Sequence, residues 1–175
     1  MLQSGRQTAG RPLSFVPIET TAGLFTVHFS ERGLAGLDFP SAQAATPAQF
    51  QSDKISAPVG DWSTLTAEAI RAVLSGLPPC RLPPLDLRTG TEFQQRVWAA
   101  LRRIGFGQTK AYAEIAAEVG SPKATRAVGG ACGANPIPLL IPCHRVLASG
   151  GKLGGFSGGL PWKKRLLALE GVTLC

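Results

Sequence analysis

The chain has 175 residues, of which 44% are hydrophobic, so it is long and apolar enough to bury a core, and wholesale disorder is excluded. No apolar run approaches the ~20 residues of a membrane-spanning helix, and the first residues lack the apolar segment of a signal peptide. We therefore expect a cytoplasmic protein with no membrane partner, and residues 1–12 are predicted to be a flexible tail.

The formal net charge of +7 is unevenly distributed. Residues 1–84 carry six basic and six acidic side chains, whereas residues 85–175 carry twelve basic and five acidic ones, so the whole excess lies in the second half. A one-sided positive field attracts phosphate backbones. Solubility alone explains the charge equally well, so this observation by itself leaves both interpretations open.

The four cysteines form no C-x-x-C pair, and with only two histidines they give no zinc-finger spacing. We predict neither a metal nor a cofactor. In a reducing compartment the cysteines are expected to be free thiols, and most free thiols are inert buried side chains. A chemical role must therefore be argued for each cysteine separately.

The Pro-rich run at residues 77–84 divides the chain, because it suits neither a helix interior nor a central strand. We predict an α/β fold: an N-terminal strand-and-helix scaffold domain (13–77), a Pro-rich linker (78–90) and a C-terminal helical domain (91–175).

The first half shows a hairpin signal, with residues 24–29 and 34–39 flanking the turn 30–33, although the alternation is imperfect. Residues 42–60 are small and polar and are expected to form a loop. Residues 65–74 place apolar side chains on one face of a short helix.

Three helices are predicted in the second half. The first starts with a Thr91–Gln94 capping box and is ended by Gly105 and Gly107. The second runs from Tyr112 to Val119 and the third, with Ser121 as N-cap, to about Cys132. The last two resemble a helix-turn-helix, whose second helix enters a DNA groove.

The segment 135–146 carries the strongest chemical signal, because its proline-bounded apolar run delivers Cys143 beside His144 and Arg145. A neighbouring base or positive charge is what turns a thiol into a nucleophile. Neighbours on a strand point to opposite faces, so Cys143 and His144 cooperate only if the backbone leaves strand geometry there. A buried cysteine at a strand end is the equally weighted alternative.

Residues 141–146 (IPCHRV) resemble the active-site signature of the O6-alkylguanine-DNA alkyltransferases. The likeness extends from about Phe93 to Gly171, with its blocks in the same order and spacing, whereas the first 84 residues match only in general pattern. The resemblance implies a winged-helix-like DNA-binding motif and a single-use transfer of the alkyl group from O6-alkylguanine, and the sequence leaves open whether O4-alkylthymine is also a substrate. The implied partner is double-stranded DNA with the damaged base flipped out of the stack, and the implied state is a monomer without an obligate protein partner.

The resemblance also implies roles for individual residues. Cys143 corresponds to the alkyl acceptor, His144 to the base acting through a water, Glu170 to the carboxylate that orients it, and Asn135 to the hinge behind the recognition helix. The implied pocket for the guanine is formed by Tyr112, Val146, Phe156, Ser157 and Gly158. The implied DNA contacts are made by Arg126, which fills the vacated stack, and by Lys123, Thr125, Ala127 and Gly129.

Two features depart from the family or stay open. Ala111 stands where many relatives carry a capping Ser, so the following helix is expected to depend on Thr109 or on packing. The run 162–165 (WKKR) suits a solvated helix start as well as a phosphate clamp.

Three other functions are considered, namely a damage-recognising protein without repair, a thiol hydrolase and a transcription regulator. The acceptor Cys143 argues against the first, and the Arg-bearing recognition helix argues against the second. The third would not need Cys143, His144 and Glu170.

Overall fold

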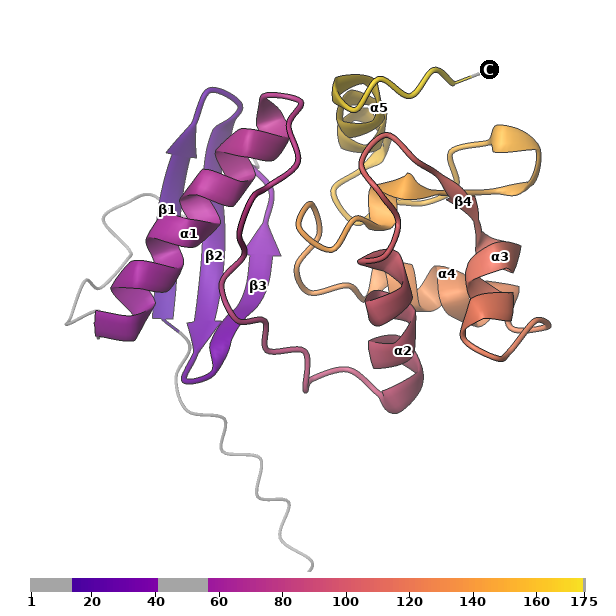
Figure 1. The fold of residues 1–175 in the computed structure, drawn as a ribbon, viewed down its shortest axis with the longest axis horizontal. Coiled ribbons are helices and arrows are strands. Elements are labelled where there is room, and N and C mark those ends of the chain that lie inside the picture. The colour runs from indigo at the N-terminus through magenta and orange to yellow at the C-terminus, as the bar shows by residue number, and fades with distance from the viewer. Residues whose placement is uncertain (1–13, 41–56, 175) are drawn as a thin grey trace, which may run out of the picture.

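The computed structural model describes residues 14–40 and 57–174, in two halves that lie side by side (Figure 1). The predicted tail at residues 1–12 and most of the predicted loop at 42–60 lie outside the described residues. No helix within the described ranges is both long and apolar enough to cross a membrane.

The first half is a three-stranded antiparallel sheet covered on one face by a helix (Figure 1). Strands β1 (Ser14–Thr20), β2 (Gly23–Ser30) and β3 (Gly33–Asp38) follow each other in order. The predicted hairpin is thus confirmed as β2–β3, and β1 was not predicted. A register shift between His28 and Phe29 explains the imperfect alternation, because an irregular pair changes which side chains face inward.

Helix α1 (Ala57–Leu74) begins eight residues before the predicted helix, so the prediction of a loop up to Gly60 was wrong at its end. The buried face extends back to Val59, which is 6% exposed and packs in the core with Ile70 and Val73. A helix in a protein forms chiefly because an apolar face is covered, so this packing outweighs the small and polar composition.

The Pro-rich segment runs along the edge of β3. Leu34 N–H donates to Pro84 O at 2.8 Å, and Asp86 N–H donates to Leu34 O at 2.8 Å. The buried Asp86 carboxylate accepts from Ser30 Oγ at 2.6 Å and from the Arg88 guanidinium at 2.7 Å. Hydrogen bonds from Arg88 hold the pKa of Asp86 well below its ordinary value, so the carboxylate stays ionised and fixes this segment to the sheet.

The second half consists of helices α2 (Glu92–Leu101), α3 (Tyr112–Glu118), α4 (Thr125–Gly133) and α5 (Leu160–Leu169). The capping box predicted for α2 is confirmed: Gln94 N–H donates to Thr91 Oγ1 and Thr91 N–H donates to Gln94 Oε1. The helix ends at Leu101, before the predicted glycines, and the next residues continue in tighter turns.

The helix predicted to begin at Ser121 begins at Thr125 instead. Ser121 N–H donates to Ala116 O at 2.9 Å, which closes α3 after the left-handed Gly120 (φ +73°). Ala124 N–H donates to Ser121 O at 2.8 Å, so Ser121–Ala124 form a turn with Pro122 at its second position. The N-cap prediction was therefore wrong, and Lys123 lies in the turn between α3 and α4.

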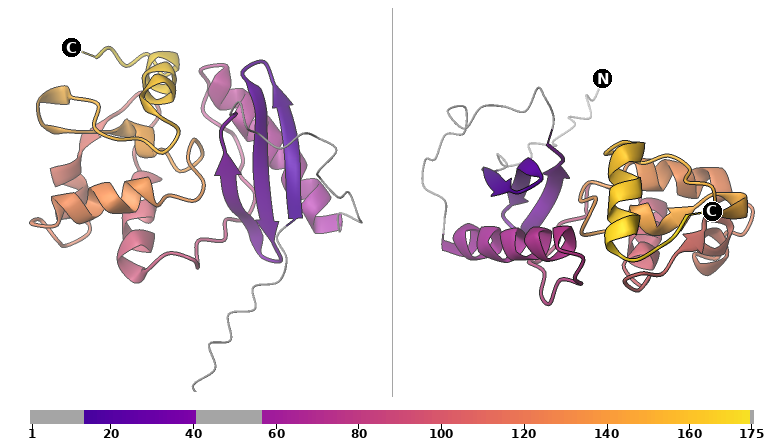
Figure 2. Two further views of the ribbon diagram at one scale, coloured as in Figure 1. Left: turned by 180° about the vertical axis from the view of Figure 1, so that it is seen from behind. Right: turned by 90° about the horizontal axis from the view of Figure 1, so that it is seen from above.

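One hydrophobic core runs through both halves of the molecule. The aromatic side chains of the sheet reach α5: Phe25 and Phe39 lie 5.6 and 4.9 Å from the Trp162 ring, between centroids. Strand β3 is the sheet strand nearest the second half (Figure 2). The two halves are therefore packed against each other through side chains as well as through the connecting segment.

Candidate functional site

Cys143 begins one turn of 3-10 helix, η2 (Cys143–Arg145). The backbone leaves strand geometry at Pro142 (φ −80°, ψ 63°), which meets the condition set by the sequence for Cys143 and His144 to act together. Cys143 is 2% exposed and His144 is 0% exposed, so both are internal. Strand β5 (Val146–Leu147) follows directly and pairs in parallel with β4 (Lys110–Ala111), which places Tyr112 at the start of α3 next to the same site.

Asn135, just after α4, holds the cysteine segment from behind. Its Nδ2 donates to Ile141 O at 2.8 Å and to Cys143 Sγ at 3.2 Å, and its Oδ1 accepts from Ile137 N–H at 3.1 Å. The same turn contains Leu139 in the left-handed region (φ +78°), a conformation that costs a non-glycine residue about 1–3 kcal/mol. The hydrogen bonds of Asn135 help hold the segment in that strained form.

Glu170, at the C-terminal end of α5, accepts hydrogen bonds from two distant parts of the chain. Its carboxylate accepts from His144 Nε2 at 2.9 Å, from Arg145 Nε and Nη2 at 2.9 Å each, and from Gly107 N–H at 3.1 Å. Burial alone would raise the pKa of Glu170, but the hydrogen bonds from His144 and Arg145 hold it at about 2. The carboxylate is therefore ionised at neutral pH.

The ionised Glu170 decides which nitrogen of His144 carries the proton. A carboxylate only accepts, so Nε2 must donate to it. Burial lowers the pKa of His144, so at neutral pH the imidazole is neutral and Nδ1 is unprotonated. Nδ1 is buried and has no hydrogen-bond partner among the described residues. The arrangement thus presents a free basic nitrogen inside the protein, beside Cys143 in the chain.

Lys163 is the site residue that the sequence reasoning missed. The run 162–165 was interpreted as a solvated helix start or a phosphate clamp, but Lys163 is 0% exposed. Its Nζ donates to Val146 O at 2.7 Å and to Gly155 O at 3.3 Å, and lies 5.9 Å from the centroid of the Tyr112 ring. The signal was its spacing: Lys163 shares a helical face with the buried Leu166, Leu167 and Glu170.

The two buried thiols differ in their surroundings. Burial raises the pKa of Cys143 to about 11, and the hydrogen bond from Asn135 and the positive charge of Lys163 oppose this rise. Burial raises the pKa of Cys132, on α4, to about 12. Both thiols are therefore protonated at neutral pH, and Cys143 accepts a hydrogen bond from Asn135 and is followed in the chain by His144.

The predicted pocket residues gather around this centre. The Tyr112 hydroxyl lies 3.5 Å from Gly155 O, and burial raises the pKa of Tyr112 to about 12, so the phenol stays protonated. The Phe156 ring stands edge-on to His144 at 6.3 Å between centroids. Val146 is buried directly after η2, whereas Ser157 and Gly158 form a partly exposed rim next to Phe156.

The predicted DNA-contact residues lie on the surface. Arg126 and Ala127 are exposed on the first turn of α4, with Thr125 before them and Lys123 in the preceding turn. Gly129, Gly130 and Gly133 have open space where a side chain would be, so α4 presents its backbone there. Ala111 has no capping side chain, and its N–H donates to Glu114 Oε2 at 2.6 Å, so this carboxylate stabilises the start of α3.

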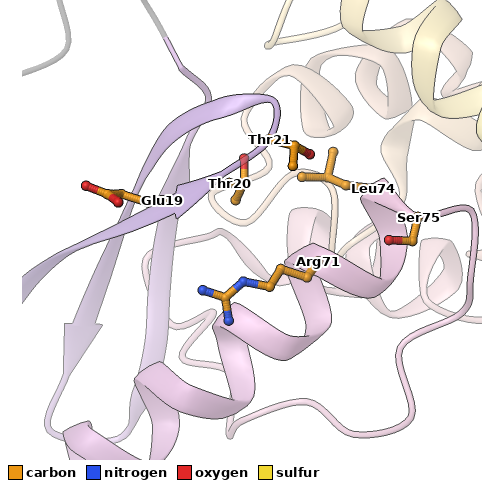
Figure 3. Close-up of a pocket in the computed structure, with 6 residues that line it drawn as sticks. All are labelled: Glu19, Thr20, Thr21, Arg71, Leu74 and Ser75. Carbon is orange, nitrogen blue, oxygen red and sulfur yellow. The ribbon is translucent and has the colours of Figure 1, made fainter.

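A hollow of about 510 Å³ lies elsewhere, between the β1–β2 turn and the end of α1 (Figure 3). None of its lining residues was predicted to be functional; they are Glu19, Thr20, Thr21, Arg71, Leu74 and Ser75. Among the residues that the structure describes, no three His, Cys, Asp or Glu side chains gather as a metal-binding group.

The fold and the site define a class of protein in which a buried cysteine lies beside two short helices with an exposed arginine. A family model described as 6-O-methylguanine DNA methyltransferase, DNA binding domain, matches residues 92–172. A methylated-DNA–protein-cysteine methyltransferase of Methanosarcina barkeri is 40% identical over 158 residues, 87% of this chain and 94% of the relative. The chain therefore belongs to the methylated-DNA–protein-cysteine methyltransferase family, which confirms the resemblance seen in the sequence.

Two further relatives show how the likeness is distributed. The protein of the same description from Mycolicibacterium paratuberculosis is 58% identical over 86 residues, 49% of this chain, so the match spans about half (52%) of that relative's length. The crystal structure of Mycobacterium tuberculosis OGT in complex with DNA has a TM-score of 0.67 at 38% identity, covering 90% of this chain and 92% of that one. This likeness confirms the predicted mixed α/β fold.

Replacing Glu170 by Gln should change how stability depends on pH. The folded pKa of about 2 lies below the ~4.3 of an unfolded glutamate, so ionisation of Glu170 stabilises the fold above that value, and this contribution is lost as the pH falls from about 5 toward 2. At pH 7, the free energy of unfolding of E170Q should be lower by about 3–5 kcal/mol, because the buried Arg145 keeps its bond to Ile104 O but loses its charged partner. In thermal melts, the melting temperature should fall steeply for the wild type between pH 5 and pH 2 and less steeply for E170Q.

The exposed Glu68 of α1 provides the matched control, and E68Q should keep the wild-type dependence on pH. Parallel curves for E170Q and the wild type would contradict the ionised state assigned to Glu170.

Proposed function

We propose that this chain repairs alkylated DNA by transferring the alkyl group from O6 of a guanine in duplex DNA irreversibly to Sγ of Cys143. The observation that carries the proposal is the internal Cys143 thiol, bonded by Asn135 and adjacent to a His144–Glu170 pair whose free nitrogen is basic. The relatives bear the name of this activity, and one was solved with DNA. The transfer needs no cofactor, because the acceptor is a side chain.

The chemistry is a displacement at carbon. The Cys143 sulfur attacks the alkyl carbon, a carbon–sulfur bond forms, and the bond from that carbon to O6 breaks, with its electron pair left on guanine. The proton of the thiol ends on the guanine, so atoms and charge balance. The thioether formed has no easy leaving path, and therefore each protein molecule acts once.

His144 supplies the base in this scheme. An unpartnered buried nitrogen costs about 1–3 kcal/mol, and one water between Nδ1 and the Cys143 sulfur would satisfy it and carry the proton. Because Nε2 stays bonded to Glu170, the imidazolium that forms is stabilised by the carboxylate. The pKa of about 11 keeps the thiol protonated until this relay acts.

Lys163 stabilises the thiolate by its charge. Its buried ammonium donates to two acceptors among the residues that the structure describes, Val146 O and Gly155 O, and its charge lowers the pKa of Cys143 against the effect of burial. In a site that is shielded from bulk solvent, a fixed positive charge acts at a lower effective dielectric constant, so its effect on the thiolate is stronger. The same two hydrogen bonds tie the start of β5 to the residue before Phe156.

The exposed face of α4 is proposed to meet the duplex. Glycines and alanines on this face permit close approach of the backbone, and Lys123 and Arg126 supply positive charge. O6 of a stacked guanine is out of reach of an internal sulfur, so the nucleotide must flip out, and Arg126 would fill the space it leaves. Asn135 then links this helix directly to the acceptor.

The protein would act as a monomer in the cytoplasm, with residues 13–77 as a scaffold domain, 78–90 as the linker and 91–175 as the DNA-binding and catalytic domain. The hydrogen bonds of Pro84 and Asp86 to β3 support a linker that is fixed to the scaffold.

The decisive experiment mixes the protein with a duplex holding one O6-methylguanine and measures the intact mass. The wild type should gain the mass of one methyl group per molecule and no more, and the methyl group should be found on Cys143. Cys143→Ser should gain nothing yet still bind the duplex, whereas Cys80→Ser, at an exposed thiol, should behave as the wild type. No gain in mass, or repeated turnover, would refute the proposal, and an O4-methylthymine duplex extends the test to the second substrate.

The charge of Lys163 is tested by Lys163→Met, which keeps a long unbranched side chain and removes the ammonium. We expect transfer to slow by about 10²-fold, the usual effect of losing one charge-stabilising donor. Its neighbour Lys164 is exposed, so Lys164→Met is the matched control and should retain the wild-type rate. Single-turnover rates measure both, and similar rates for the two variants would show that the buried charge has no part in the reaction.

A further inference from the structure

Strand β3 of the first half ends against two segments of the site. Leu37 N–H donates to Pro136 O at 2.9 Å, directly after Asn135. Two residues further on, the Phe39 ring lies 5.6 Å from the Phe156 ring, at 69°, and 4.9 Å from the Trp162 ring, between centroids. The end of this strand therefore supports both the cysteine segment and the pocket loop, which is defined here as residues 156–158.

The contact between Phe39 and the pocket loop leaves no spare room. A Cβ at Gly158 would lie 2.7 Å from two carbons of the Phe39 ring and 2.9 Å from Phe156 Cε1. Carbon atoms at van der Waals contact are about 3.5–4.0 Å apart, so the ring abuts the Gly158 backbone. The loop cannot move toward the sheet while Phe39 is in place.

The pocket loop in turn borders the reacting groups. Phe156 stands edge-on to His144 at 6.3 Å, and the preceding Gly155 O accepts from Lys163 Nζ at 3.3 Å. A displacement of the loop toward the sheet would therefore enlarge the space next to the histidine and the cysteine. The ring of Phe39 is what opposes that displacement.

We propose, on the basis of the alkyl transfer proposed above, that Phe39 is a positioning residue through which the first half limits the size of the alkyl group that Cys143 accepts. The ring supports the pocket loop from outside, so the loop meets a methyl group in a preformed geometry. A bulky alkyl group needs the loop to yield, and Phe39 opposes it. The first half thus sets the selectivity of a site to which it contributes no reacting atom.

The test compares single-turnover rates on duplexes that carry O6-methylguanine or O6-benzylguanine. In Phe39→Leu the ratio of the benzyl rate to the methyl rate should rise about fivefold, because the smaller side chain lets the loop yield to the larger alkyl group. A fivefold change corresponds to about 1 kcal/mol. The control is Phe29→Leu, which alters a ring of the same sheet that is more deeply buried than Phe39 and packs on Trp62. Its melting temperature should fall at least as much as that of Phe39→Leu, with the ratio of the two rates unchanged.

A second variant tests the contact itself. Gly158→Ala should slow methyl transfer, because the added Cβ collides with the Phe39 ring, and the double variant Gly158→Ala with Phe39→Leu should recover much of the loss. An unchanged ratio in Phe39→Leu, or strictly additive effects in the double variant, would overturn the inference. If the wild type transfers no methyl group at all, the proposed function fails, and the coupling of the two substitutions in thermal melts still reports whether the ring supports the loop.

Discussion

The site depends on the hydrogen bonds of the Glu170 carboxylate, because they join three segments that are far apart in sequence. The carboxylate fixes the turn at Gly107, the end of α5 and the His144–Arg145 pair of η2 through hydrogen bonds of 2.9 to 3.1 Å. A buried carboxylate is tolerable only when it is fully paired, and this one has a partner for each oxygen. Its ionisation then determines the imidazole tautomer and leaves Nδ1 as a base. The reactivity of Cys143 is in this way set by a residue with which it shares no hydrogen bond.

Local signals predicted the elements whose ends are determined by their own residues. The capping box of α2, the glycine after α3 and the turn between β2 and β3 were found because side chains or backbone conformation act within a few positions. The early start of α1 and the late start of α4 were missed for different reasons. Tertiary packing of Val59 extends α1 toward its N-terminus, and such packing is not visible in a window of sequence. At α4, the Ser121 N–H donates to Ala116 O and so belongs to the end of α3, although Ser-Pro is also typical of a helix start.

Within the family signature, the residues named from the sequence lie together in the structure, whereas contacts outside the signature were not foreseen. Cys143, His144, Asn135 and Glu170 were named from the resemblance, and the structure brings them together. The buried state of Lys163 was missed because a run of charged residues ordinarily faces solvent. The contact of Phe39 with the pocket loop joins residues more than a hundred positions apart, and the first half has no sequence signature that would predict it.

The most direct test of this account is the protonation of the His144 ring, measured from the ¹⁵N chemical shifts of its two nitrogens. The chain has only two histidines, and His144→Gln assigns the signals. At neutral pH we predict a neutral imidazole with the proton on Nε2, where it bonds to Glu170, and an unprotonated Nδ1. A proton on Nδ1, or an imidazolium throughout the neutral range, would contradict the account, because no base would then stand ready to take the proton of Cys143.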